Sequence, residues 1–450
     1  MSRPATLLMW CALLCTAGLL VSLGACGSGS SNRGLPPVAS QKIRHVVVIF
    51  QENRSPDNLF HDPVLMARGA DIASSGMNSS GQTIPLTPIP LAIDYDPLHG
   101  HDPFLSMYDG GKIDGADKIG IICAQGAMNC PPPNPQFAYV DPADVAPYFQ
   151  LAEQYTFADR MFQTNQGPSF PAHQFIISGT SAPTPTSNLF AAENPTGTSD
   201  TGQGCASPPD TTVAMIDPTG SEAITQYPCF DHSTLVDLLD AKMVSWRYYA
   251  PFAGSIWTGP NAIQHLRFGP DWTNDVVLNS PQVLTDIATG QLAAVSWVIP
   301  TGQTSDHAIT TDGSGPSWVA SVVNAIGNSP YWSDTAIFIT WDDWGGWYDH
   351  VAPPIINSYE YGFRVPMIVV SPYAKAAYVS HVTHDFGSIL KFTEEVYGLG
   401  SLGYADALAD DLSDCFDFSQ TPLPFHAVSA QFDANHFLND KRPPTDPDDD

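Results

Sequence analysis

Side chains that could bind a metal ion follow two hydrophobic segments of the chain, residues 45–50 and 336–341. They are Glu52 and Asn53 after the first segment, and Asp342 and Asp343 after the second. Short segments rich in β-branched and aromatic residues are typical of strands buried in a parallel sheet. Ligands of such sheets lie beyond the carboxyl ends of the strands. We therefore predict that the four side chains meet around one divalent cation.

The chemistry of these ligands narrows the choice of metal. Carboxylate and amide oxygens favour hard cations such as Ca²⁺, Mg²⁺ or Mn²⁺. A metal of this kind beside a nucleophile is typical of enzymes that cleave phosphate esters. The alternative is structural, because Asp342 and Asp343 precede Gly345 and Gly346 and could simply form a turn.

Ser169 is the candidate nucleophile. It is followed two residues later by Pro171, at the start of an apolar segment that reads as a helix. This order predicts that the Ser169 hydroxyl lies at the N-cap. There the free N–H groups and the helix dipole favour a phosphoryl group. The alternative is that Ser169 only caps the helix.

Three motifs together resemble one family of bacterial phosphoesterases. They are Gln-Glu-Asn-Arg-Ser at residues 51–55, Gly-Pro-Ser-Phe-Pro-Ala-His at 167–173, and Trp-Asp-Asp-Trp-Gly-Gly-Trp-Tyr-Asp-His-Val at 341–351. The family contains phospholipases C and respiratory-burst-inhibiting acid phosphatases, and the similarity spans roughly residues 44–399. The motifs occur in the family's order. The resemblance implies hydrolysis of phosphoric ester bonds and a core fold like that of alkaline phosphatase.

The resemblance also implies roles for particular residues. Glu52, Asn53, Asp342 and Asp343 match the metal ligands, and Asn53 also matches a residue that reaches phosphate. Ser169 matches the Ser or Thr that attacks phosphorus. The family usually has Asn where this chain has Ala172, so any contact from that Asn to phosphate is lost or supplied elsewhere.

Four histidines are further candidates. The segment Ser-Asp-His that ends at His307 resembles a family loop whose His binds phosphate or protonates the leaving group. The segment 98–101 resembles a loop with one functional His, and we assign catalysis to His101 and substrate binding to His99. His350 either contacts substrate or only pairs with Asp349.

These roles imply a reaction through a phosphoserine on Ser169, with a proton for the leaving alcohol from His307 or water. Imidazolium groups at His101 and His307 would predict an acidic activity optimum. We favour an acid phosphatase-like activity on small phosphate esters. The main alternative is a phospholipase C, with an apolar approach formed by Phe252, Trp257, Trp344 and Trp347 unless these are core residues. A second alternative is an inactive, lipid-anchored binding protein.

The composition limits the partners of the protein. Of 450 residues, 17 are basic and 46 acidic, which gives a net charge of -29. Such a charge repels nucleic acid, so we expect no nucleic-acid partner. Hydrophobic residues make up 43% of the chain and charged residues 14%, which is typical of a globular protein with a large core.

The N-terminus predicts export. An apolar stretch from Leu7 to Leu23 follows Arg3, so we assign residues 1–25 to a signal peptide and 26–40 to a flexible tether. The residues before Cys26 resemble a bacterial lipoprotein box. We therefore expect a periplasmic or cell-surface protein whose only contact with the membrane is a lipid anchor at Cys26. Ordinary cleavage without a lipid is the alternative.

The remaining cysteines suggest disulfides, as expected in an oxidising compartment. Cys123 with Cys130 and Cys205 with Cys229 are the simplest local pairs, which leaves Cys415 as the odd thiol. A site for a soft metal is the alternative, but the chain has no paired CxxC motif to support it.

Strand-like and helix-like segments alternate along the rest of the chain. This pattern predicts an α/β three-layer sandwich with a mostly parallel central sheet. We place the phosphoesterase domain at residues 41–438, with long insertions at about 60–147 and 182–232 and a disordered tail at 439–450. We also predict a helix at 233–243 with Ser233 as its N-cap, and a helix at 386–397.

Overall fold

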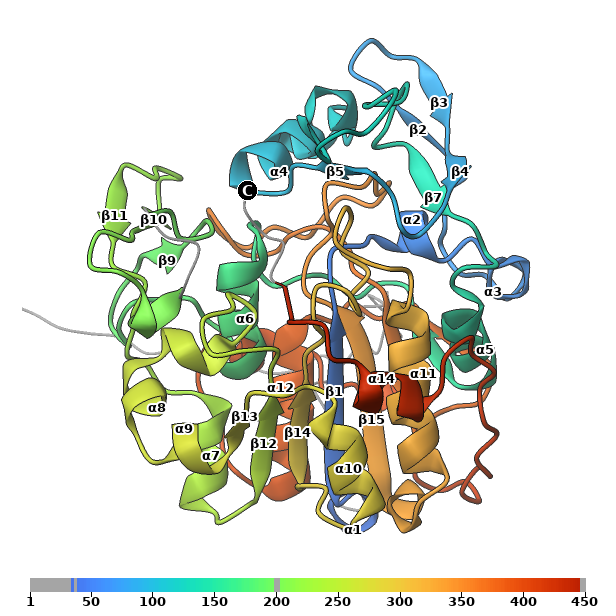
Figure 1. Cartoon of the computed structure of the whole chain (residues 1–450), viewed down its shortest axis with the longest axis vertical. Coiled ribbons are helices and arrows are strands. Elements are labelled where there is room, and N and C mark those ends of the chain that lie inside the picture. Colours follow the sequence, from blue (N-terminus) through green and yellow to red (C-terminus); the bar gives the residue numbers. More distant parts are fainter. Residues whose placement is uncertain (1–33, 36–38, 198–202, 446–450) are drawn as a thin grey trace, which may run out of the picture. The chain divides into compact units, whose positions relative to one another are not determined.

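The structure is a computed structural model and describes residues 34–35, 39–197 and 203–445 (Figure 1). The predicted signal peptide, Cys26 and most of the tether lie outside these residues. Helix α1 (Ala39–Lys42) already begins within the range predicted as tether. In the part of the chain that the structure describes, no helix is both long enough and apolar enough to span a membrane.

One eight-stranded sheet forms the centre of the molecule (Figure 1). Its strands, in spatial order, are β13 (Val276–Val277), β12 (Trp246–Tyr249), β14 (Val295–Val298), β1 (His45–Gln51), β15 (Thr335–Trp341), β16 (Met367–Val370), β8 (Thr156–Ala158) and β17 (Tyr378–Ser380). Only β16 runs antiparallel to its neighbours. The predicted mostly parallel sheet is therefore confirmed.

The central strands are buried along their whole length. All seven residues of β15 and six of the seven in β1 are buried, so helices must cover both faces of the sheet. In Figure 1, α10 (Gln282–Ala288), α11 (Gly315–Gly327) and α14 (Ala434–Asn439) lie in front of the sheet. Helix α12 (Phe386–Tyr397) lies behind it and packs against α6 (Ser169–Ser178). The α/β fold with three layers is confirmed.

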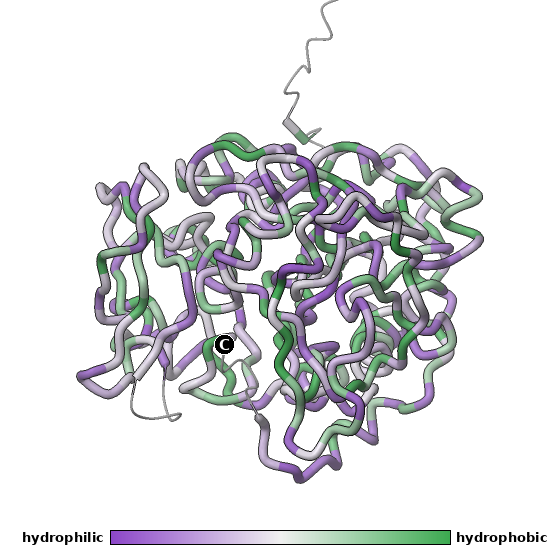
Figure 2. The backbone as a smooth tube through the Cα atoms, turned by 90° about the horizontal axis from the view of Figure 1, so that it is seen from above, coloured by the Kyte–Doolittle hydropathy of each residue, from purple (hydrophilic) through white to green (hydrophobic). Residues whose placement is uncertain are grey.

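Two insertions flank the sheet. The first contains β2 (Ser75–Met77), β3 (Thr83–Pro85), β4 (Thr87–Ile89), β5 (Tyr95–Pro97), α4 (His101–Tyr108), β6 (Ile121–Cys123) and β7 (Ala138–Val140). The second contains β9 (Phe190–Ala191), β10 (Val213–Ile216) and β11 (Ile224–Gln226). The first lies above the sheet in Figure 1, and Figure 2 views the molecule from above, with hydrophilic and hydrophobic stretches interspersed along the chain.

Each insertion contains a disulfide, and the first insertion also has a small hydrophobic core. The first has a small core in which Phe104, Met107 and Phe137 are fully buried. Both predicted disulfides are present, Cys123–Cys130 in the first insertion and Cys205–Cys229 in the second. Cys415 is the remaining thiol of the described residues and is buried.

The other elements are short, apart from α5. The remaining α-helices are α2 (Pro56–Leu59), α3 (Pro63–Ala67), α5 (Ala146–Gln154), α7 (Leu235–Ala241), α8 (Gln264–Phe268), α9 (Asp271–Asn274) and α13 (Ala405–Leu408). Single 3-10 turns lie at Asp109–Gly111, Ala116–Lys118, Gly204–Ala206, Gly259–Ala262, Pro330–Asp334 and Ser413–Cys415.

Two boundary predictions need correction. The N-cap of α7 is Thr234 and not Ser233, because Thr234 and Asp237 form a reciprocal capping box. The tail is ordered up to Thr445: Gly302 N donates to Thr445 O at 2.9 Å, and Arg442 pairs with Asp312 at 2.7 Å. A disordered tail from residue 439 was therefore wrong for residues 439–445.

Candidate active site

The pairing of β1 with β15 brings the two acidic segments together. In this parallel pair Gln51 lies opposite Trp341, so both strands end at the same level. The hydrogen-bonding pattern continues beyond the strands, where Asp342 N donates to Gln51 O at 3.0 Å and Arg54 N donates to Asp343 O at 3.0 Å. The two loops therefore leave the sheet side by side, as the sequence predicted.

The backbone at Asn53 adopts a left-handed conformation, with φ of 64°. Its N–H donates to Asp342 Oδ1 at 3.2 Å. Gly345 packs against this turn so closely that a Cβ there would lie 2.3 Å from Asn53 O, so only glycine fits. Asp343 Oδ1 accepts a hydrogen bond from Gly345 N at 2.7 Å. The turn expected as the structural alternative therefore exists, and it uses one oxygen of Asp343.

Ser169 lies directly beside these carboxylates. Its Oγ donates to Asp342 Oδ2 at 2.5 Å and is 3.4 Å from Asp343 Oδ2. All three side chains are fully buried. Ser169 is the first residue of α6, and its N-cap is Pro168. The prediction that the hydroxyl caps the helix was wrong: the hydroxyl donates to a charged carboxylate, and the structure shows no side-chain cap at this end of α6.

The loop before α6 is tied to the loop that follows β15. Gln163 Nε2 donates to Gly167 O at 3.1 Å, and Gln163 Oε1 accepts from Trp344 N at 3.0 Å. Asn165 Nδ2 also donates to Gly167 O, at 2.9 Å. One buried amide thus connects the segment that carries Ser169 to the segment that carries the two aspartates.

His173 belongs to the same cluster and was missed by the sequence analysis. Its Nε2 lies 3.2 Å from Glu52 Oε1 and 3.9 Å from Asp342 Oδ2. The spacing of four residues from Ser169 was the available signal, since residues four apart share a face of a helix. His173 is the last residue of the motif at 167–173, but the sequence alone suggested no role for it.

The cluster fits a bound cation. Ligand atoms of Glu52, His173 and Asp342 all lie within 4.8 Å of one another. Asn53 Oδ1 is buried and has no hydrogen-bond partner among the described residues. Three carboxylates in a fully buried site are costly unless a positive charge accompanies them. The donor set therefore fits a divalent metal.

His99 and His307 lie beside Asn53. His99 Nδ1 donates to Pro97 O at 2.9 Å, so His99 Nε2 accepts the hydrogen bond from Asn53 Nδ2 at 2.8 Å. This bond directs the amide nitrogen of Asn53 to the imidazole and leaves the amide oxygen for another partner. The rings of His99 and His307 are 5.7 Å apart, and His307 Nδ1 donates to Ala308 O at 2.8 Å.

His101 lies at the start of α4 and contacts the second insertion. Its Nδ1 lies 2.5 Å from Glu222 Oε1, its Nε2 lies 3.3 Å from Gln166 Oε1, and its backbone N–H donates to Glu193 Oε1 at 2.9 Å. These contacts tie His101 to the second insertion and to the loop before α6. Burial raises the pKa of Glu193 to about 7. The geometry places His99, and not His101, next to Asn53.

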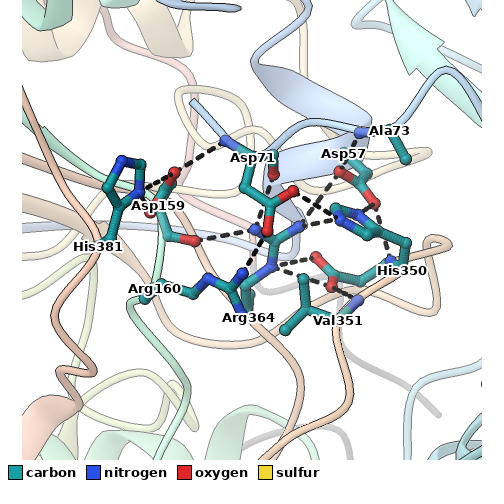
Figure 3. Close-up of polar contacts among 10 residues, drawn as sticks. Asp57, Asp71, Ala73, Asp159, Arg160, His350, Val351, Arg364 and His381 are labelled. Carbon is teal, nitrogen blue, oxygen red and sulfur yellow. Dashed lines mark hydrogen bonds and ion pairs between the residues drawn. The ribbon is translucent and has the colours of Figure 1, made fainter. Parts of the chain in front are cut away.

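The structure does not bring His350 into this cluster. His350 lies in a separate ion-pair network (Figure 3). Its Nδ1 lies 2.6 Å from Asp57 Oδ2 and its Nε2 lies 2.9 Å from Asp71 Oδ1. Burial opposes the charged imidazole, but the hydrogen bond and the charge of Asp57 raise the pKa of His350 to about 9. Because carboxylates occupy both ring nitrogens, a substrate-binding role for His350 loses its support.

Arg364 is the centre of that network (Figure 3). Its Nε donates to both Asp349 oxygens at 3.0 Å, and its Nη2 donates to Asp57 Oδ1 at 3.2 Å. Ligand atoms of Asp57, Asp349 and His350 would also be close enough to hold a metal. The guanidinium already supplies the positive charge, so we interpret this group as a structural network that anchors the end of the 342–351 segment.

Arg54 is buried, and its guanidinium bonds to other parts of the protein. Its Nε and Nη2 donate to Asp306 O at 2.9 and 2.7 Å, and its guanidinium lies 5.0 Å from the ring centre of Trp347. The acceptor of both bonds is the backbone carbonyl of Asp306. Burial raises the pKa of the Asp306 carboxyl to about 6. Arg54 therefore holds the loop that carries His307.

The tryptophans considered as an approach for lipid are core residues. Trp257, Trp344 and Trp347 are each fully buried. Trp344 packs in the core of the first insertion, and Trp347 packs against Tyr95 in a neighbouring cluster. They position the loop after β15 and offer no surface to a lipid.

Comparisons with known proteins agree with this chemistry. The chain is 24% identical to a non-hemolytic phospholipase C of Burkholderia pseudomallei, over 84% of this chain and 59% of that protein. It is 24% identical to phospholipase C B of Mycobacterium tuberculosis, over 91% of this chain and 84% of that protein. A non-specific phospholipase C6 of Arabidopsis thaliana is also 24% identical, over 84% and 73%.

A structural comparison pairs the chain with an alkaline phosphatase superfamily protein from Vibrio parahaemolyticus, at 9% identity and a TM-score of 0.40. The match covers 83% of this chain and 72% of that protein. The model of the Phosphoesterase family matches residues 43–400, which contain every residue of the cluster around Ser169. The chain therefore belongs to the Phosphoesterase family and is a hydrolase that acts on phosphoric ester bonds.

Proposed function

We propose that the protein is a metal-dependent phosphoesterase that forms a phosphoserine on Ser169. The observation that carries this proposal is the position of Ser169 Oγ, 2.5 Å from Asp342 Oδ2 at the N-terminus of α6. A nucleophile needs a group that orients its proton and a site that accepts the developing negative charge. Ser169 has the carboxylate for the first and the helix N-terminus for the second.

The residues that would hold the metal are Glu52, Asn53, Asp342 and Asp343. A divalent cation there supplies positive charge, which lowers the cost of a serine alkoxide and neutralises a phosphate oxygen. This assignment rests on the buried carboxylates and on the oxygen of Asn53 that has no partner among the described residues.

The protein's own side chains account for the proton movements. Ser169 gives its proton to Asp342 Oδ2 as its oxygen bonds to phosphorus, and the bond from phosphorus to the alcohol oxygen breaks. His307 protonates the departing alcohol. Water then attacks phosphorus and cleaves the phosphoserine: His307 takes a proton from this water, and Asp342 returns its proton to the departing Ser169 oxygen. We expect an acidic activity optimum, because imidazolium groups, which would offset the negative charge of the transition state, form in acid.

We propose small phosphate esters as the substrate class, in the manner of an acid phosphatase. The burial of Trp257, Trp344 and Trp347 supports this choice, because they provide no apolar path for diacylglycerol. Phospholipase C activity is the second candidate, favoured by the names of the relatives. A decayed binding protein is the third, and the presence of every residue of the Ser169 cluster speaks against it.

The test combines turnover with detection of the intermediate. We expect release of p-nitrophenol from p-nitrophenyl phosphate, loss of activity with a chelator, and recovery with added divalent metal. Acid-quenched enzyme should carry phosphate on Ser169, as measured by mass spectrometry of its peptides. Faster turnover of p-nitrophenyl phosphorylcholine would shift the assignment to phospholipase C, and no turnover of either ester would support the binding protein.

Ser169→Ala should lower kcat by at least about 1000-fold, because the nucleophile is lost. It should leave bound metal unchanged, as measured by metal analysis. Ser178→Ala is the matched control, since Ser178 lies at the other end of α6 and bonds only to backbone oxygens and His232. Full activity in Ser169→Ala would redirect the mechanism to attack by water.

We further propose that the protein is exported and anchored through a lipid on Cys26. The support is the order of residues in the N-terminal segment, with an apolar stretch that ends before a cysteine. Labelling with a fatty acid should mark the wild-type protein and not Cys26→Ser. Release of an unlabelled protein by the wild type would instead indicate ordinary cleavage.

A further inference from the structure

His173 lies one helical turn after the nucleophile and is fully buried. Its two ring nitrogens face different surroundings. Nε2 faces the carboxylates, 3.2 Å from Glu52 Oε1 and 3.9 Å from Asp342 Oδ2. Nδ1 lies on the opposite side of the ring, 3.3 Å from the hydroxyl of Tyr248.

The hydroxyl of Tyr248 determines where the proton of His173 lies. Tyr248 OH donates its only hydrogen to Trp257 O at 2.8 Å and accepts from Gly259 N at 3.3 Å. Since that hydrogen is used, the contact with His173 requires Nδ1–H as the donor. In the neutral ring, the lone pair of Nε2 therefore points toward Glu52 and Asp342.

The position of the ring is fixed by its surroundings as well as by this bond. The segment that contains Gly259 packs on α6 so closely that a Cβ at Gly259 would lie 2.5 Å from His173 O. Tyr248 itself belongs to β12, a strand of the central sheet. The imidazole thus lies between the sheet and the carboxylates. Metal-binding histidines are commonly oriented in this way, by a hydrogen bond from the ring nitrogen that does not bind the metal.

We propose that His173 Nε2 is a ligand of the metal, together with Glu52 and Asp342, and that Tyr248 fixes the tautomer needed for binding. This inference rests on the metal of the proposed function. A lone pair aimed at two carboxylates is unfavourable alone and becomes favourable when a cation lies between them. The ligand atoms of these three residues, all within 4.8 Å of one another, provide that position.

A nitrogen ligand changes the expected metal. Oxygen ligands alone favour Ca²⁺, Mg²⁺ or Mn²⁺, whereas imidazole suits transition metals such as Fe²⁺ and Zn²⁺ and is also accepted by Mn²⁺. With His173 in the ligand set, we expect the protein to bind Mn²⁺, Fe²⁺ or Zn²⁺ in preference to Ca²⁺ and Mg²⁺. The competing explanation is an imidazolium that only pairs with Glu52 and Asp342.

The experiment is pulsed electron paramagnetic resonance of the full-length protein loaded with Mn²⁺, which detects a directly bound ¹⁴N. We expect nitrogen coupling in the wild type and in His99→Gln, and no coupling in His173→Gln. His232→Gln is the matched control, because His232 is a buried histidine bonded to Ser178 Oγ at the far end of α6. It should keep the coupling.

Tyr248→Phe tests the same inference if His173→Gln does not fold. It removes one oxygen from a buried ring and should weaken Mn²⁺ binding by about tenfold, as measured by titration of the free ion. A merely structural pairing of His173 with carboxylates would leave the Mn²⁺ affinity of Tyr248→Phe unchanged. An unchanged affinity would therefore overturn the proposal.

The possible failures can be told apart. Turnover that depends on Mn²⁺, without nitrogen coupling or with coupling that persists in His173→Gln, overturns the ligand role of His173 and leaves the proposed function intact. A wild-type protein that binds no divalent metal and hydrolyses no phosphate ester overturns both. Preference for Ca²⁺ or Mg²⁺ over the transition metals also contradicts the inference.

Discussion

At the scale of single residues, the amide of Asn53 shows how neighbours select the atom that is offered to a ligand. His99 accepts from the amide nitrogen, and the nitrogen of His99 can accept only because its other nitrogen donates to Pro97 O. The amide oxygen of Asn53 is thereby left buried and without a hydrogen-bond partner among the described residues. His99 acts through Asn53 in this arrangement, so we regard it as a positioning residue.

Glu193 gives a prediction about pH. Burial raises its pKa to about 7, so the folded protein favours the protonated form. Its contribution to stability is complete below the ordinary glutamate pKa of about 4.3 and is lost as the pH rises through 7. Glu193→Gln should therefore stabilise the protein at pH 8 by about 4 kcal/mol, at about 1.4 kcal/mol per pH unit. Urea unfolding between pH 4 and pH 8 measures this difference.

The control for Glu193 is Glu395→Gln on α12, which should keep the wild-type dependence on pH. The glutamine at position 193 retains an oxygen for the backbone N–H of His101, so the local structure should persist. Equal stability of Glu193→Gln and wild type at pH 8 would show that Glu193 titrates normally in the folded protein.

The residues of the candidate site differ in how far the sequence could reveal them. Glu52 and Asp342 follow strong strand patterns, and the positions after such strands are constrained by the sheet. The partner of His101 could not be found in this way, because Glu222 is 121 residues away in another insertion and no sequence pattern links them. His350 likewise pairs with Asp57, 293 residues away, and not with the adjacent Asp349 alone.

At the scale of elements, the connection between two loops decides the position of the nucleophile. Gln163 bridges Gly167 O and Trp344 N with the two ends of one buried amide. Neither loop has regular secondary structure at these positions, so side-chain bonds replace the backbone ladder that would otherwise hold them. The distance between Ser169 and the aspartates therefore depends on this amide.

Gln163→Leu should lower kcat by about 100-fold with little change in KM, because a small displacement of the nucleophile affects the reaction more than binding. Initial rates over a range of substrate concentrations separate the two constants. The variant should also lose about 1–3 kcal/mol of stability, since the buried N–H of Trp344 loses its partner, whereas Gly167 O keeps the bond from Asn165. Urea unfolding measures this loss.

Gln282→Leu on α10 is a suitable control for Gln163, because Gln282 is half-buried and bonds to Asp286 on its own helix. It should leave both kinetic constants at their wild-type values. A kcat of Gln163→Leu equal to that of the wild type would mean that the two loops keep their distance without the amide.

Elements with strong local signals were predicted well, and elements defined by distant contacts were not. Helix α12 has the predicted bounds of Phe386–Tyr397, since Asp385 and Ser388 form a capping box and Gly398 ends the helix in a left-handed conformation. The N-cap of α7 was misplaced by one residue because Ser233 and Thr234 are both good caps and only Asp237 decides between them. The tail was misjudged because its partners lie near residues 302–312.

At the scale of the whole molecule, negative charge accumulates inside the protein as well as on its surface. The chain has a net charge of -29, and the cluster around Ser169 adds three buried carboxylates. A bound divalent metal would compensate part of this charge at the point where burial makes it most costly. Metal binding should then be coupled to the stability of the entire domain.

Removal of metal should lower the unfolding temperature. At a metal concentration of 100 times Kd, binding to the folded state stabilises by about 2.7 kcal/mol, and a chelator removes this contribution. Differential scanning calorimetry with chelator, and after restoration of Mn²⁺, measures the change. Ca²⁺ at the same concentration should restore less. An unfolding temperature that does not respond to chelation or to added metal would contradict a metal site in the folded protein.

The bond between His101 and Glu222 joins the first insertion to the second. Ser169 has no exposed surface. In the proposed reaction, a phosphorus atom has to reach an oxygen that solvent does not touch, so the residues that cover Ser169 would have to move apart to admit substrate. The rate of this movement would then set an upper limit on kcat. A disulfide between cysteines introduced into the two insertions should then leave the residues around Ser169 in place but prevent substrate from reaching them.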